Sequence, residues 1–256
     1  MFIRAELKQK AKENLHRNLW LCIGVTFVFG LLSSDLFGLN VDPTTYEYYF
    51  RMGLGTSGDI SMDFIYIPIT SIVASLVLLA SLSFKILIVN PIIVGHTRFY
   101  IENKYGKSSF EALFAYFNAN DYWNVVKVML LYDIYIILWT LCFIVPGIIK
   151  SYEYYFVPYI LAENPNMDSD EIFEITKEMT SGHKFDLFVL ELSFILWNLL
   201  ALITLGLSTL YVNPYMLATK CEAYYFFKQE LLNNEIIQEE IMEETAHVEP
   251  TIDDLH

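Results

Sequence analysis

Six long apolar segments alternate with shorter polar segments along this 256-residue chain. Apolar runs of roughly 17 to 25 residues match the hydrocarbon thickness of a bilayer when they are helical. The pattern predicts membrane spans at about 18–34, 64–94, 125–145, 147–162, 187–205 and 207–227. Pro146-Gly147 and Gly206 supply short turns between paired spans. The predicted fold is therefore an all-α membrane protein with six transmembrane helices arranged as three hairpins.

The distribution of basic residues predicts the orientation. Of the 16 Lys and Arg residues, Arg51 alone lies in a segment predicted to be external. Because cytoplasmic loops carry an excess of Lys and Arg, we expect in-out-in hairpins with both termini in the cytoplasm. Residues 2–17 and 108–117 are expected to form amphipathic helices on the cytoplasmic membrane surface. For residues 2–17, a solvated charged lead-in fits equally well.

Composition agrees with a membrane protein and isolates one further region. The chain is 55% hydrophobic and only 18% charged, which excludes an ordinary soluble domain. Residues 1–228 are expected to form a single multi-pass membrane domain. The segment 229–256 holds nine acidic residues and no Lys or Arg, although the net charge of the whole chain is −14. We expect an acidic cytoplasmic tail that either keeps the chain soluble or binds a protein partner.

An internal repeat appears in the returning helices. The tripeptide Val-Asn-Pro occurs at 89–91 and again at 212–214, and Pro-Tyr-x-Leu-Ala occurs at 158–162 and 214–218. Pro91, Pro158 and Pro214 are therefore predicted to kink three helices at corresponding places. Such kinks either open a cavity between the hairpins or only shape their packing.

Charged residues inside the predicted spans are the candidate site residues. Asp133 lies about eight residues into the third span, too deep for its short side chain to reach water easily. Lys150 and Glu153 are three residues apart on one face of the fourth span, and Glu191 lies near the inner end of the fifth. These residues either line a polar pathway or ligand site, or make structural hydrogen bonds between helices.

Catalytic and metal-binding patterns are not evident. The three cysteines lie in apolar segments without CxxC spacing, and the five histidines show no metal-ligand spacing. The sequence contains no GxSxG or HExxH motif and no glycine-rich phosphate loop. We therefore expect no catalytic residues, no enzyme activity, no metal, no cofactor and no nucleic-acid partner.

The C-terminal half resembles a known family through a series of motifs in order. These are Pro146-Gly147-Ile148-Ile149-Lys150, Tyr159-Ile160-Leu161-Ala162-Glu163-Asn164-Pro165, Gly182-His183-Lys184, Leu192-Ser193-Phe194 with Trp197, and Pro214-Tyr215 with Tyr224-Tyr225. They resemble the bacterial integral membrane family filed as domain of unknown function 975. Residues 147–190 are more distantly similar to the membrane domain of some glycerophosphoryl diester phosphodiesterases. The resemblance implies a plasma-membrane protein without established activity, in contact with lipid.

Two functions follow as expectations. The first is a non-catalytic component that assists an envelope or lipid-related process, with membrane lipids and a protein partner in the membrane or at the acidic tail. The alternative is a transporter or permease-like protein for a small molecule or lipid, with a polar site around Asp133.

Overall fold

The computed structural model describes residues 2, 4–33, 75–107, 109–118, 120–195, 197, 199, 203–204 and 206–248. Within these ranges all regular secondary structure is helical, which confirms the all-α prediction for this part of the chain. The helices are α1 (Arg4–Arg17), α2 (Leu19–Ser33), the π-helix η1 (Lys85–Val89), α5 (Asn90–Lys104), the 3₁₀ helix η2 (Phe110–Asn118), α6 (Tyr122–Cys142), α7 (Ile144–Glu153), α8 (Val157–Glu163), α9 (Ser169–Met179), α10 (Lys184–Leu192) and α12 (Thr209–Val248).

Two of the described helices are long and apolar enough to cross a membrane. They are α6 and the continuous helix Ser75–Lys104, which contains η1 and α5. The pair α1 and α2 passes the same test only together, bent by 95°. These helices indicate a membrane protein, with two spans, or three if the bent pair forms one. The six predicted spans and the three-hairpin arrangement are not confirmed, and residues 64–74 of the predicted second span lie outside the described ranges.

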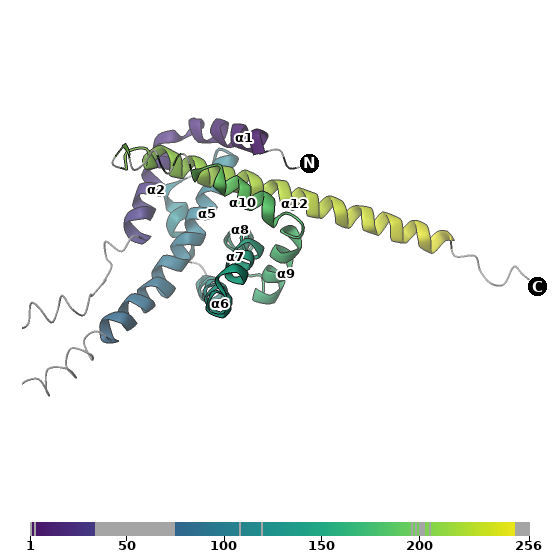
Figure 1. Ribbon diagram of the computed structural model, residues 1–256, viewed down its shortest axis with the longest axis horizontal. Helices are drawn as coiled ribbons and strands as arrows, with labels where there is room; N and C mark the ends of the chain where they lie inside the picture. The colour runs from purple at the N-terminus through teal and green to yellow at the C-terminus, as the bar shows by residue number, and fades with distance from the viewer. Residues whose placement is uncertain are drawn as a thin grey trace, which may run out of the picture.

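Helix α1 lies against α12 (Figure 1). Leu7, Ala11 and Leu15 recur every four residues on one face of α1, and all three are buried. Phe2, just before the helix, stacks on Phe227 with 5.0 Å between ring centroids. This face of residues 2–17 therefore packs against protein, which differs from the expectation that it enters a lipid surface.

The chain reverses direction between α6 and α7 at Phe143. This residue is extended (φ −160°, ψ 145°) and separates the two helices. Pro146 falls in the first turn of α7, where its missing N–H costs no helical hydrogen bond. The reversal thus lies a few residues before the expected turn at 146–147. Gly147 instead allows close packing, because a Cβ there would lie 2.4 Å from Thr140 Oγ1.

The range predicted as the fourth span, 147–162, is divided between two short helices. Helix α7 ends at Glu153, residues 154–156 form a turn, and α8 begins at Val157. Pro158 occupies the first turn of α8, the place where a helix tolerates proline. Helices of 10 and 7 residues rise about 15 Å and 10 Å, each less than the roughly 30 Å hydrocarbon core.

The segment 110–118, also expected at the membrane surface, packs on α5. Ala112, Leu113 and Tyr116 are buried on this side of η2, and the Tyr116 hydroxyl donates to the Ala162 carbonyl at 2.6 Å. Close contact requires Gly95, because a Cβ there would lie 2.2 Å from the Leu113 carbonyl oxygen. The η2 backbone therefore lies directly on α5.

Helix α12 is the longest element and leaves the bundle at one end (Figure 1). Its 40 residues correspond to about 60 Å of helix. The predicted sixth span, 207–227, falls largely within α12. The predicted fifth span, 187–205, begins within α10, and part of it lies outside the described residues, as do residues 249–256 of the tail.

Candidate functional site

Asp133 lies near the middle of α6, roughly 16 Å of helical rise from Tyr122. Lys85 Nζ lies 3.1 Å from Asp133 Oδ2, and Asn90 Nδ2 donates to the same oxygen at 2.9 Å. Both partners belong to the helix Ser75–Lys104. The charge of Asp133 is therefore balanced by a lysine of the neighbouring helix.

The π-helical turn explains how Lys85 and Asn90 reach the same carboxylate. In an α-helix, residues five apart point about 140° away from each other. In η1 the Asn90 N–H instead donates to the Lys85 carbonyl five residues back. The wider π-helical turn therefore places both residues towards the same face of the helix. Pro91 follows and has no N–H, so a carbonyl of the preceding turn loses its helical donor. The Tyr122 hydroxyl donates to one such carbonyl, that of Leu87, at 2.8 Å.

Within the part of the chain that the structure describes, one buried polar atom beside Asp133 has no hydrogen-bond partner. Asn90 is fully buried, and although its Nδ2 binds Asp133, its Oδ1 accepts no hydrogen bond. Leaving a buried acceptor unsatisfied costs about 1 to 3 kcal/mol. Buried polar groups are normally satisfied, so this oxygen is suited to accept a hydrogen bond or to coordinate a cation.

Glu153 is buried at the end of α7 and binds two lysines. Lys150 pairs with it from the preceding turn and Lys184 from the start of α10. The Thr180 hydroxyl donates to the backbone carbonyl of Glu153 at 3.1 Å. This cluster joins α7 to α10 and to the residue that follows α9.

Glu191 occupies a separate cluster near the end of α10. Lys220 Nζ donates to it at 2.7 Å, and the hydroxyls of Tyr152 and Tyr155 donate to it at 2.7 Å and 2.9 Å. Three elements, α10, α12 and the α7–α8 segment, therefore meet at one carboxylate.

The predicted site residues thus fall into three groups. Lys150 and Glu153 come together, Glu191 has its own partners, and Asp133 binds Lys85 rather than Lys150. The Asn-Pro pair of the internal repeat was the available sequence signal for Asn90.

Glu163 is a further carboxylate that the sequence did not single out. The hydroxyls of Tyr224 and Tyr225 donate to it at 2.6 Å each, and Lys228 forms an ion pair with it. Burial alone raises the pKa of the Glu163 carboxyl. The hydrogen bonds from Lys228 and the two tyrosines outweigh burial and hold this pKa below its ordinary value of 4.5.

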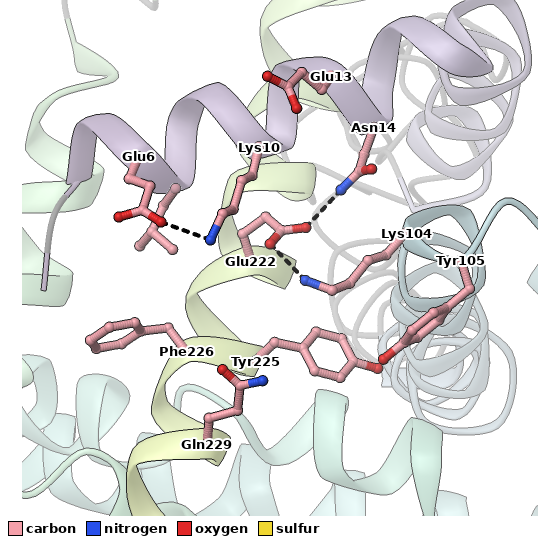
Figure 2. Close-up of a pocket in the computed structure, with 11 residues that line it drawn as sticks. Glu6, Lys10, Glu13, Asn14, Lys104, Tyr105, Glu222, Tyr225, Phe226 and Gln229 are labelled. Atoms are coloured by element: carbon pink, nitrogen blue, oxygen red, sulfur yellow. Dashed lines mark hydrogen bonds and ion pairs between the residues drawn. The ribbon is translucent and has the colours of Figure 1, made fainter.

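Glu222 was also missed, and it forms the floor of a groove between α1, α12 and the end of α5 (Figure 2). It is buried and accepts hydrogen bonds from Lys104 Nζ at 2.6 Å and Asn14 Nδ2 at 2.8 Å. The groove encloses about 670 Å³. Its residues are Glu6, Leu7, Lys10, Glu13, Asn14, Lys104, Tyr105, Glu222, Tyr225, Phe226 and Gln229. Two ion pairs lie there, Lys10 with Glu6 and Lys104 with Glu222.

The three predicted kink prolines occupy different helical contexts. Pro91 follows the π-helical turn, Pro158 begins α8, and Pro214 lies within α12. The repeated sequence therefore corresponds to three distinct local structures.

The chemistry of the site is that of charge pairing. In the described part of the chain, no group of three or more His, Cys, Asp and Glu side chains is placed to hold a metal ion. Glu153, Glu163, Glu191 and Glu222 each bind a lysine from another helix. These pairs hold helices together, whereas the group at Asp133 retains an unsatisfied acceptor.

Comparison with known proteins adds a family. Residues 143–231 match the family described as "Protein of unknown function (DUF975)", a range that runs from the start of α7 into α12. No curated protein and no solved structure matches the chain. The expected similarity to glycerophosphoryl diester phosphodiesterases is not found. The predicted family is confirmed over residues 143–231, the part of the chain that matches the DUF975 family of unknown function.

Proposed function

We propose that the protein is a non-catalytic membrane component that holds a partner protein beside the plasma membrane for an envelope or lipid-related process. The observation that carries the proposal is the continuity of α12. Tyr224 and Phe227 of this helix are buried in the bundle, whereas Leu232 and Asn233 are exposed. The same helix continues to Val248 without a break (Figure 1).

The ion pairs give the projecting part of α12 a fixed direction. Lys220 and Lys228 tie the helix to Glu191 and Glu163 just before it leaves the bundle. From residue 229 to 248 the helix rises about 30 Å. Its charge in this part is acidic, so the partner would present a basic surface. The acids are Glu230, Glu235, Glu239, Glu240, Glu243 and Glu244.

Lipid contact is the second support. Leu76, Leu78 and Leu79 of the helix Ser75–Lys104 are largely exposed, as are Leu141 and Phe143 at the α6–α7 turn. Apolar surface of this extent is costly in water and favourable in hydrocarbon. The membrane lipids would cover these side chains.

Breaking the projecting helix tests the proposal without changing its charge. Asn233→Pro interrupts α12 just outside the bundle, whereas Asn233→Ala preserves the helix and serves as the matched control. Both full-length variants would be crosslinked in native membranes, and the co-purified proteins quantified by mass spectrometry. We expect one protein to be recovered with the parent and Asn233→Ala and to be lost with Asn233→Pro. Equal recovery with all three chains would refute the role of the rigid helix.

A transporter or permease-like role is the second candidate, and the unsatisfied Asn90 Oδ1 beside Asp133 favours it. A transport pathway would bring water to this depth. Met129 precedes Asp133 by one helical turn and is buried, so Met129→Cys would report on water access there. The exposed Cys142 would first be replaced by serine. Labelling by a membrane-impermeant thiol reagent supports the pathway, and complete protection in every condition eliminates it.

A further inference from the structure

We infer that Asp133, Asn90 and the π-helical turn form a binding site for a monovalent cation, which exchanges with the Lys85 ammonium. The inference deepens the second candidate function. It concerns binding alone and holds whether or not the cation is transported.

The available ligands are oxygen atoms. Asp133 supplies a carboxylate, and Asn90 supplies a fully buried amide oxygen without a partner. Pro91 lacks the N–H that would bond the Leu87 carbonyl, which accepts instead from the Tyr122 hydroxyl and keeps a second lone pair for a cation. Carboxylate, amide and backbone carbonyl oxygens are the ligands that hard cations prefer. Interrupted membrane helices use such carbonyls to coordinate sodium.

The charge at the site selects a monovalent cation. Asp133 contributes one negative charge, and Lys85 balances it with Nζ 3.1 Å from Oδ2. A monovalent cation in place of this ammonium preserves neutrality around the carboxylate. A divalent cation would leave an excess positive charge, and an anion would face Asp133, both unfavourable where the dielectric constant is low.

The exposure of the two side chains allows exchange. The Lys85 side chain is 49% exposed, whereas that of Asp133 is 20% exposed. The long lysine side chain can therefore turn away from the site and towards the membrane surface. Asn90 is buried at the start of α5, so the helix keeps its backbone in place when the ammonium leaves.

The test compares cations at equal ionic strength. The purified full-length chain in nanodiscs would be unfolded thermally in sodium, potassium or choline chloride. Lys85→Met removes the competing ammonium, and we expect sodium or potassium to raise its Tm by at least about 4 °C over choline. The parent should show a smaller rise. Asp133→Asn should show none, and the exposed Glu6→Gln should behave like the parent.

A direct binding measurement keeps the inference testable if Lys85→Met does not fold. Radioactive sodium or potassium would be bound to the parent and to Asn90→Leu, which removes the amide oxygen but retains Lys85 and Asp133. We expect at least a tenfold loss of affinity in Asn90→Leu. Absence of saturable binding in the parent, or equal affinity in both chains, would overturn the inference. Binding combined with a protected Met129→Cys would retain the cation site and reject transport.

Discussion

Gly95 provides a direct test of the packing between α5 and η2. A Cβ at this position would lie 2.2 Å from the Leu113 carbonyl oxygen, 2.7 Å from its carbonyl carbon and 2.9 Å from the Ala112 carbonyl oxygen. All three atoms belong to the backbone, so a side-chain rotation cannot relieve the clash. Gly95→Ala must separate η2 from α5. Overpacking of this kind costs about 1 to 3 kcal/mol, and the rigid backbone places this case at about 2 to 3 kcal/mol.

A second glycine in a helix supplies the control. Gly24 in α2 has no atom within 4 Å of its Cβ position, so Gly24→Ala gains helix propensity without a clash. Thermal unfolding in the same detergent would compare both variants with the parent. We expect Tm to fall by roughly 5 to 10 °C in Gly95→Ala and to stay constant or rise in Gly24→Ala. Equal Tm values for the two variants would refute the close approach of η2 to α5.

Two further predictions concern the buried carboxylates. Lys104→Met leaves the buried Glu222 without its lysine and should lower the free energy of unfolding by about 3 kcal/mol, measured by thermal unfolding. Lys10→Met, which removes an exposed ion pair, should leave Tm unchanged. Because Glu163 has a pKa below 4.5 when folded, its ionised form stabilises the fold above pH 4.5, and this contribution is lost as the pH falls through the lowered pKa. Glu163→Gln should therefore lower Tm at pH 7, and its difference from the parent should shrink as the pH falls below 4.5. A Tm difference that stays constant as the pH falls would contradict the Lys228 pairing.

The broad architecture was predictable because it depends on local patterns. Apolar runs are long enough to identify membrane-type helices, and the motifs between 146 and 225 identified the family. Both signals depend on neighbouring residues along the chain. The position of Pro91 also indicated where a backbone hydrogen bond of a helix is lost.

The partners of the charged residues could not be predicted in the same way. Lys85 and Asp133 are 48 positions apart, and a hydropathy pattern does not specify which helix faces which. The π-helical turn places Lys85 on a face that regular helical spacing would not assign to it. Similarly, the apolar face of α1 fits either a lipid surface or another helix, and only tertiary packing selects α12. Contacts distant in sequence therefore determined the site.

The distance along the outer part of α12 tests the central claim most directly. Spin labels would be attached at Gln229→Cys and His247→Cys in a chain carrying Cys142→Ser, and measured by double electron–electron resonance in nanodiscs. A continuous helix separates the two backbone positions by about 27 Å, so the account predicts one narrow distribution near that distance. A broad distribution, or one centred far from it, would show that α12 ends at the bundle and would contradict the proposal of a rigid projecting helix.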